Sequence, residues 1–270
     1  MSELIGPPLG APPKPAAGTC ATCGKVVEAV WIPGIEKPRW WVPSLCADCL
    51  AAAQGVRRQQ QEAEAHSAWL RERIERAGLG GVRRLQTFAV FRPVPGTRGA
   101  LAAAQQFAKV CAGEALPSRG LLFVGENGSG KTLLATAVLN YVLEENHTLS
   151  ALLVRFSDYL LKLRAAFGNR DDVMRAMDLR QVMATVDLLV MDDLGAAAMT
   201  RSEWDSEELA RVLEDRDLAG LPILATCDLS GAELERRLGR RIVSRLFGMC
   251  RVVPMADGPV EAADYRRREQ

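Results

Sequence analysis

The chain has 270 residues, of which 48% are hydrophobic, and its formal net charge is +1. This length suits one ordinary domain with a small appendage, or two small domains, and the apolar content suffices for a core. A charge so close to zero excludes a wholesale polyanion binder, so any contact with nucleic acid requires a local patch. We expect a soluble, cytoplasmic protein with no membrane partner, since no long uncharged apolar segment and no apolar signal core is present.

The first part of the chain combines a proline-rich tail with two cysteine pairs. Residues 1–18 cannot build a core, and we expect them to be disordered. Two C-x₂-C pairs follow, formed by Cys20, Cys23, Cys46 and Cys49. Four thiolates in this arrangement suit a closed, structural zinc site, so residues 19–50 are expected to form a zinc-binding module that folds with the metal. Redox pairing is the alternative, and it is weak in a cytoplasmic protein.

The spacer between the cysteine pairs predicts a hairpin of the zinc-ribbon kind. Pro33-Gly34 divides it into an apolar run at 26–31 and another at 39–42. Trp31, Trp40 and Trp41 are too many large aromatics for so small a core. At least one of them is expected to face a partner protein or to pack against the helix that follows.

A connecting helix is predicted over residues 51–80, where helix formers dominate until three glycines, Gly78, Gly80 and Gly81, end the segment. His66 within it is expected to be a solvated helix residue, because the cysteine set already completes a zinc site.

A single α/β domain is expected over residues 81–256, followed by a tail at 257–270. Its strands are predicted at 120–124, 151–156, 187–191, 221–226 and 251–254. Helical segments are expected near 98–112, 131–145, 157–167, 203–219 and 230–248. Five strands joined by crossover helices imply a mostly parallel sheet covered on both faces, with ligands at the carboxyl ends of the strands.

The motif G-x-x-x-x-G-K-T lies between the first of these strands and a helix. Its residues are Gly125, Glu126, Asn127, Gly128, Ser129, Gly130, Lys131 and Thr132. Such a loop turns its backbone N–H groups toward phosphates, and the N-terminus of the following helix adds positive potential. Lys131 would reach the β- and γ-phosphates and Thr132 would bind Mg²⁺. The sequence therefore predicts a nucleoside triphosphate site.

A second element of this site is the apolar run V-D-L-L-V-M-D-D at 186–193, which predicts a buried strand ending in two carboxylates. Asp192 would hold Mg²⁺ through water, and Asp193 would orient or deprotonate the attacking water. A strand that merely ends in solvated acids is the alternative. Two carboxylates beside a phosphate loop favour hydrolysis over storage of the nucleotide.

Five stretches of the region from Gly81 to about Pro254 carry a more specific resemblance. They are T-F-A-V-F at 87–91, G-L-L-F-V-G-E-N-G-S-G-K-T-L-L-A, V-R-F-S-D-Y-L-L-K-L-R-A-A-F, D-L-L-V-M-D-D-L-G and R-I-V-S-R-L. This region resembles the AAA+ ATPase core of bacterial replicative helicase loaders, the DnaC and DnaI group, and less closely the IstB transposition helpers. The resemblance implies an AAA+ fold without a separate lid, ATP and Mg²⁺ as ligands, and a replicative hexameric DNA helicase as partner. A DnaI-like loader also has an N-terminal zinc module that touches the helicase.

The same resemblance gives roles to Arg241 and Arg245. One helical turn separates them, so both project from one face. One of them, with Arg245 as the first choice, would meet the γ-phosphate bound by a neighbouring subunit. Surface arginines on an amphipathic helix are the alternative. Without a lid the neighbour would close over the nucleotide, so self-assembly is expected to depend on ATP or on a partner.

Asp228 departs from the family pattern. After the fourth strand the family usually has a neutral polar residue, often Asn, that touches the γ-phosphate and water. An ionised Asp accepts hydrogen bonds but donates none, and it repels the triphosphate. Either Thr226 takes this task or hydrolysis is slow, and we expect slow turnover.

Residues 155–180 are the candidate surface for single-stranded DNA, because cations and aromatics alternate there. These residues are Phe156, Tyr159, Lys162, Arg164, Phe167, Arg170, Arg175 and Arg180, with Arg155 at the start. Backbone charge and base stacking are what sequence-tolerant binding needs. A buried stripe through Phe156, Leu160, Leu163 and Phe167 is the alternative.

Two functions follow from the sequence. The first is an ATP-dependent loader that binds a helicase through the zinc module and single-stranded DNA through the ATPase domain. The second is an IstB-like ATPase helper of a transposase, acting on duplex DNA. A small-molecule phosphotransferase would need a substrate pocket and a lid with arginines, and the sequence indicates neither.

Overall fold

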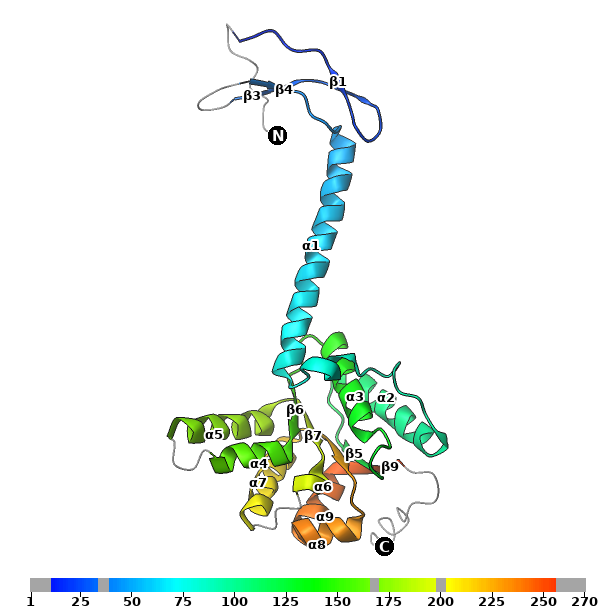
Figure 1. Ribbon diagram of the computed structural model, residues 1–270, viewed down its shortest axis with the longest axis vertical. Coiled ribbons are helices and arrows are strands. Elements are labelled where there is room, and N and C mark those ends of the chain that lie inside the picture. Colours follow the sequence, from blue (N-terminus) through cyan, green and yellow to red (C-terminus); the bar gives the residue numbers. More distant parts are fainter. Residues whose placement is uncertain (1–10, 34–38, 166–169, 198–202, 256–270) are drawn as a thin grey trace. The chain divides into compact units, whose positions relative to one another are not determined.

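The computed structural model describes residues 11–33, 39–165, 170–197 and 203–255, and the chain divides into two units, Met1–Trp69 and Leu70–Gln270 (Figure 1). Most of the predicted tail at 1–18 and the whole tail at 257–270 lie outside the described residues. Each unit is considered by itself.

The first unit contains two short antiparallel strand pairs. β1 (Gly18–Thr19) pairs with β2 (Val26–Val27), and β3 (Val30–Ile32) pairs with β4 (Arg39–Trp41). The hairpin predicted on either side of Pro33 is therefore confirmed, but the predicted strand at 26–31 is two strands with different partners. The reason is the turn at the first cysteine pair, where the Cys20 N–H donates to the Lys25 carbonyl and brings β1 alongside β2.

The three tryptophans of this unit have different environments. Trp31 is buried, and its ring meets that of Trp40 edge-on with centroids 5.4 Å apart. Trp40 also donates a hydrogen bond from Nε1 to the Pro12 carbonyl. Trp41 remains exposed, opposite Val30 in the hairpin register. The Trp31 ring, with Val27 and Ala29, thus forms the small core of the module, and the partly buried Trp40 packs against it.

Helix α1 (Ala47–Arg76) begins earlier and ends earlier than the predicted connecting helix. It starts inside the second cysteine pair, where the Leu50 N–H donates to the Cys46 carbonyl, so Cys49 lies on its first turn. It ends before Gly78, whose φ of 82° suits a glycine. None of its residues is buried, in agreement with the predicted solvated position of His66.

The second unit is built on one parallel sheet. Its strands are β5 (Gly120–Val124), β6 (Ala151–Arg155), β7 (Leu188–Asp192), β8 (Ile223–Cys227) and β9 (Cys250–Pro254). They lie in the order β6-β7-β8-β5-β9, and every neighbouring pair is parallel. The predicted fold class is confirmed, and each predicted strand lies within two residues of the observed one.

The helices of this unit cover both faces of the sheet (Figure 1). Short 3₁₀ turns, η1 (Gly81–Leu85) and η2 (Pro95–Thr97), precede them. The helices are α2 (Arg98–Cys111), α3 (Lys131–Glu145), α4 (Phe156–Ala165), α5 (Arg170–Thr185), α6 (Leu194–Ala197), α7 (Glu203–Ala219), α8 (Gly231–Leu238) and α9 (Arg240–Met249).

Two of these helices correct the predictions. The single helix expected at 230–248 is interrupted at Gly239, whose φ of 87° ends α8 before α9 begins. The sequence did not predict α5, because its polar residues and scattered methionines show no clear apolar face.

Alternating strand residues supply two separate cores. On β7, Leu188 and Val190 pack with α2 and α3, whereas Leu189 and Met191 pack with α4, α7, α8 and α9. This two-sided burial explains why the strands have continuous apolar runs. The parallel pairing of all neighbouring strands sets their carboxyl ends along one edge of the sheet.

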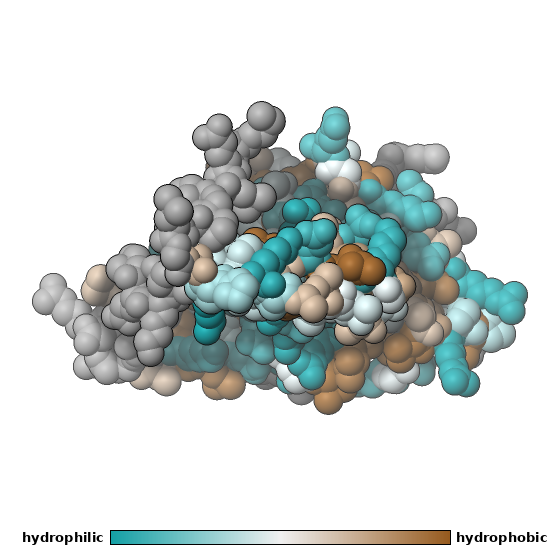
Figure 2. Space-filling model, turned by 90° about the horizontal axis from the view of Figure 1, so that it is seen from above, coloured by the Kyte–Doolittle hydropathy of each residue, from teal (hydrophilic) through white to brown (hydrophobic). Residues whose placement is uncertain are grey.

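No helix among the described residues is long and apolar enough to cross a membrane. On the face seen in Figure 2, hydrophobic residues occur in small groups among hydrophilic ones.

Arg216 on α7 is fully buried, at 0% exposure. It connects the segments that lead into β7 and β8, at the amino ends of these strands. Its guanidinium donates to the carbonyl oxygens of Met183, Val186 and Pro222 at 2.7–2.8 Å. Burial lowers its pKa to about 10, so the side chain stays charged at neutral pH.

Arg216→Met is therefore expected to lower the free energy of unfolding by at least about 3 kcal/mol, because three buried carbonyls lose their donor. Arg211→Met, on an exposed position of the same helix, is the control and should change it by less than about 0.5 kcal/mol. Urea denaturation followed by circular dichroism measures both. Equal midpoints for the two variants would contradict this role.

Candidate nucleotide site and cysteine cluster

The loop between β5 and α3 has the backbone that a phosphate site requires. Gly130 lies at φ 90°, and a Cβ at this position would come within 2.7 Å of Phe91 Cε2. The buried ring of Phe91, from the predicted T-F-A-V-F stretch, thus packs directly against the loop. Only glycine satisfies both the backbone conformation and the close contact.

Lys131 begins α3 and is nearly buried. Its Nζ donates to the carbonyl oxygens of Gly125 and Glu126, both at 2.7 Å. Burial lowers the pKa of this ammonium group, and the nearby Asp228 opposes that change. The loop therefore holds a cation at the N-terminus of a helix, where an anionic group is favoured.

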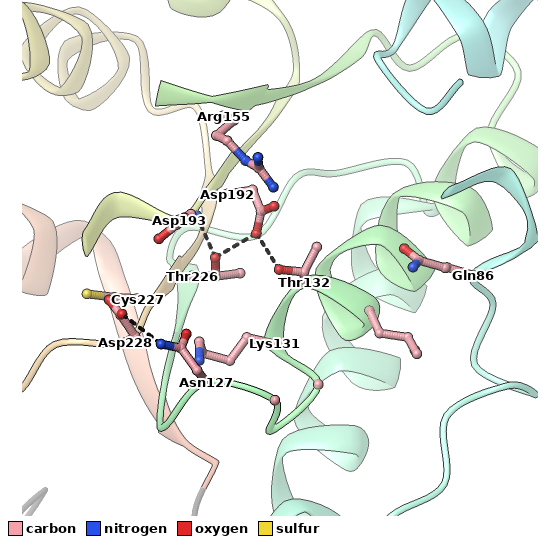
Figure 3. Close-up of a pocket in the computed structure, with 13 residues that line it drawn as sticks. Gln86, Asn127, Lys131, Thr132, Arg155, Asp192, Asp193, Thr226, Cys227 and Asp228 are labelled. Atoms are coloured by element: carbon pink, nitrogen blue, oxygen red, sulfur yellow. Dashed lines mark hydrogen bonds between the residues drawn. The ribbon is translucent and has the colours of Figure 1, made fainter. Parts of the chain in front are cut away.

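Asp192 is the centre of a hydrogen-bond network at the end of β7. Its Oδ1 accepts hydrogen bonds from the hydroxyls of Thr132 and Thr226, both at 2.8 Å (Figure 3). The Thr226 hydroxyl in turn accepts a 2.8 Å hydrogen bond from the Asp193 N–H, and Asp193 has a positive φ of 61°. Three elements, α3, β7 and β8, are joined through these side chains.

The same residues fit a magnesium ion. Asp192 is only 1% exposed, and no described residue donates a hydrogen bond to its Oδ2. The Thr132 hydroxyl lies beside this carboxylate. Hydroxyl and carboxylate oxygens are the hard ligands that Mg²⁺ prefers, usually with several waters.

A cavity of about 320 Å³ opens over these groups. It is lined by Gln86, Asn127, Gly128, Gly130, Lys131, Thr132, Leu133, Arg155, Asp192, Asp193, Thr226, Cys227 and Asp228. Most of the predicted nucleotide residues therefore come together, whereas Gly125, Glu126 and Ser129 belong to the loop but not to this lining.

Four lining residues were not predicted as part of this site, namely Gln86, Leu133, Arg155 and Cys227, and the first and third of them have polar side chains. Arg155 ends β6 opposite Asp192 in the strand register and points toward it (Figure 3). The sequence instead predicts Arg155 as part of the surface for single-stranded DNA. Gln86 comes from the segment before the domain core, where no motif marks it.

Asp228 lies in the cavity beside the phosphate loop. Its Oδ2 accepts a 3.4 Å hydrogen bond from Asn127 Nδ2, and its buried Oδ1 has no partner among the described residues. Thr226 is buried, and its hydroxyl is already engaged by Asp192 and Asp193. Of the two residues considered for contact with the γ-phosphate, Asp228 therefore has the side chain that is less engaged by other residues.

Arg241 and Arg245, which were predicted to meet the γ-phosphate of a neighbouring subunit, lie on α9 and outside the cavity lining. Both contact Glu214 on α7, Arg241 at 3.8 Å and Arg245 at 3.3 Å, which agrees with their predicted shared face. Arg245 also lies 3.7 Å from Asp217. The Arg245 side chain is 25% exposed and that of Arg241 is 78% exposed.

The candidate DNA surface is only partly as predicted. Phe156, Tyr159, Leu160 and Leu163 are buried, so the alternative of a buried stripe holds for the described part and these rings cannot stack on bases. Phe167 lies outside the described residues, as do the side chains of Arg170 and Arg175.

The cations of this segment also differ from one another. Arg164 pairs with Asp205 and Arg180 with Glu208, both on α7. Lys162 is exposed on α4.

The four cysteines of the first unit form a cluster. Their sulfur atoms all lie within 4.8 Å of one another, and Cys23 Sγ is 3.6 Å from Cys46 Sγ. Backbone N–H groups of Cys46, Cys23 and Thr22 lower the pKa of Cys20 to about 6, whereas hydrogen bonds to the neighbouring thiols raise that of Cys49 to about 12. Sulfur atoms about 3.8 Å apart are what tetrahedral zinc with bonds of about 2.3 Å needs, so the cluster fits this metal.

The comparison with protein families decides the class of the second unit. Residues 82–251, more than half of the chain, match the bacterial DnaA ATPase domain. The chain belongs to this family. It is therefore an AAA+ ATPase related to replication proteins, with ATP and Mg²⁺ as its ligands, and the family resemblance seen in the sequence is confirmed at this level.

Solved structures of several replication proteins have a similar fold. The DnaC helicase loader has a TM-score of 0.54 and 22% identity, over 64% of this chain and 98% of that one. The DnaI structure has a TM-score of 0.52 and 23% sequence identity, and the match covers 62% of this chain and 89% of DnaI. Replication initiator DnaA bound to AMPPCP and single-stranded DNA has 0.54 and 19%, over 64% of this chain and only 50% of that one. A comparison with curated proteins found no match.

Asp228→Asn is expected to raise the rate of ATP hydrolysis per subunit by about tenfold, because it removes a negative charge from the cavity and adds a donor. Asp215→Asn, at an exposed position of α7, is the matched control and should leave the rate unchanged. Release of inorganic phosphate measures the rate. A slower Asp228→Asn variant would show that the carboxylate supports hydrolysis instead of limiting it.

Proposed function

We propose that this ATPase is a helicase loader. Its ATPase domain binds single-stranded DNA, and a zinc module at residues 19–50 binds a replicative hexameric DNA helicase. The observation that carries the proposal is the pairing of a closed four-cysteine cluster with a DnaA-family ATPase domain. The fold match to nearly the whole length of the DnaC helicase loader supports it.

The nucleotide-site residues have distinct proposed roles. The backbone of the loop from Gly125 to Gly130 holds the phosphates, and Lys131 moves from the loop carbonyls to the β- and γ-phosphates. Thr132 and Asp192 hold Mg²⁺, which supplies charge stabilisation at the phosphates when bound. Asp193, at the edge of the same cavity, orients or deprotonates the attacking water.

Completion of the site depends on a neighbouring subunit in this proposal. Arg245, or Arg241 beside it, would exchange its Glu214 contact for the γ-phosphate of the neighbour. Ion pairs that solvent reaches are individually weak, and Glu214 is 40% exposed, so such an exchange has a small cost. Self-assembly that depends on ATP or on the partner follows from this arrangement.

The DNA contact is proposed through charge rather than through stacking. A DnaA structure with this fold is bound to single-stranded DNA. In this chain the described aromatic rings of α4 are buried, whereas Lys162 is exposed. Contacts of this kind read the phosphate backbone, are independent of sequence and weaken as salt increases.

The zinc module is the proposed docking tool for the helicase. Four thiolates close the coordination sphere, so the metal has no open position for catalysis. Exposed apolar side chains, Trp41 among them, remain on the module. Zinc would hold this small structure together, since its apolar core contains little more than Val27, Ala29, Trp31 and the partly buried Trp40.

A pulldown against the replicative ring helicase of the same cell, with ATP present, tests the proposal. We expect the wild-type protein and Cys111→Ala, a buried cysteine outside the cluster, to bind it. Cys46→Ser/Cys49→Ser is expected to lose zinc and at least about 90% of the helicase binding, because its module no longer folds. Its binding of a fluorescent ATP analogue should stay intact.

Two results would contradict the loader function. One is a zinc-free double variant that binds the helicase as well as wild type does. The other is a wild-type protein that does not bind, which would favour the transposase helper instead.

A further inference from the structure

The segment at residues 81–86 is fixed beside the nucleotide cavity by a buried side chain. Asn140 on α3 is 5% exposed, and its Nδ2 donates to the backbone carbonyls of both Arg83 and Gln86, at 3.0 and 2.9 Å. Gln86 lines the cavity. A buried amide that holds two carbonyls of a short 3₁₀ turn gives this segment a defined position on the ATPase core.

Arg83 extends from this segment toward Asp192. Its guanidinium lies 4.0 Å from Asp192 Oδ2, the buried oxygen that receives no hydrogen bond from the described residues. In the part of the chain that the structure describes, no other cation lies within 4.0 Å of this carboxylate. Arg155 also points toward this carboxylate, from the end of β6 (Figure 3).

A guanidinium beside Asp192 adds to the charge of Lys131, which also interacts electrostatically with this carboxylate but donates its hydrogen bonds to loop carbonyls. A buried carboxylate without a counter-charge is unfavourable, and the two hydroxyls on Oδ1 carry no charge. Arg83 is 31% exposed on its side chain, so it can supply the charge and still leave toward solvent. A metal ion and a guanidinium near one carboxylate repel each other, since both are positive.

We propose that Arg83 is a resident counter-ion of Asp192 that competes with the divalent cation at the nucleotide site. It holds the carboxylate in place for Thr132 and Thr226, and its positive charge lowers the affinity of the site for free metal. Metal then enters mainly together with the nucleotide, whose phosphates offset the repulsion. The inference rests on the proposed magnesium role of Asp192.

Two measurements on the full-length protein test this role. The first is the binding of Mn²⁺ alone, without nucleotide, where electron paramagnetic resonance separates free from bound metal. The second is the melting temperature in EDTA. Arg83→Gln is expected to bind Mn²⁺ at least about threefold more tightly than wild type and to melt at a lower temperature.

Two control variants show whether tighter Mn²⁺ binding is caused by loss of the Arg83 charge. Arg84→Gln changes the exposed neighbour on the same turn, and Arg83→Lys keeps the charge, so both are expected to bind Mn²⁺ as wild type does. A purely structural role for Arg83 would lower the melting temperature and the Mn²⁺ affinity together. Unchanged or weaker Mn²⁺ binding by Arg83→Gln would overturn the inference.

The proposed magnesium role of Asp192 can fail separately. Arg83→Gln/Asp192→Asn is expected to lose the gain in Mn²⁺ affinity, because the carboxylate that binds the metal is absent. If the double variant bound Mn²⁺ as tightly as Arg83→Gln, the metal would lie on other groups. The assignment of Asp192, and with it the counter-ion, would then be wrong.

Discussion

The buried carboxylate of Asp192 organises the nucleotide site. One of its oxygens receives the hydroxyls of Thr132 and Thr226, which lie on α3 and β8, while Asp192 itself ends β7. These bonds fix the distance between the phosphate loop and the acidic strand, so the loop cation and the carboxylates face the same cavity. A buried, hydrogen-bonded polar network of this kind is rigid when it is satisfied and costly when it is broken.

The rest of the ATPase domain holds in place the hydrogen-bonded group of Asp192, Thr132 and Thr226. Continuous apolar runs bury β5, β7 and β8 on both faces, and the parallel pairing of these strands brings their carboxyl ends to one edge. Arg216 ties the opposite edge together through buried carbonyls. The family relationship adds the chemistry, since the chain belongs to the bacterial DnaA ATPase domains. In the proposed function, the cysteine cluster holds together the module that binds the helicase.

Much of this site was predictable from the sequence because local patterns determine it. The glycines before Lys131 and the apolar run before Asp192 are read directly, and parallel strands must bring them together. Long-range contacts were not predictable. No motif marks the register that sets Arg155 opposite Asp192, the burial of Arg216, or the contact of Arg83 with a carboxylate more than a hundred residues away. The break at Gly239 and the helix α5 were missed because apolar periodicity alone neither locates a left-handed residue nor shows a mostly polar helix.

The most direct test of the hydrogen-bonded group of Asp192, Thr132 and Thr226 replaces only the Thr226 hydroxyl. Thr226→Val keeps the shape of the side chain but removes the donor to Asp192 and the acceptor for the Asp193 N–H, whereas Thr226→Ser keeps the hydroxyl. Affinity for a fluorescent ATP analogue with Mg²⁺, measured by equilibrium titration, should fall about tenfold or more in Thr226→Val and stay near wild type in Thr226→Ser. Wild-type affinity in Thr226→Val would contradict the account.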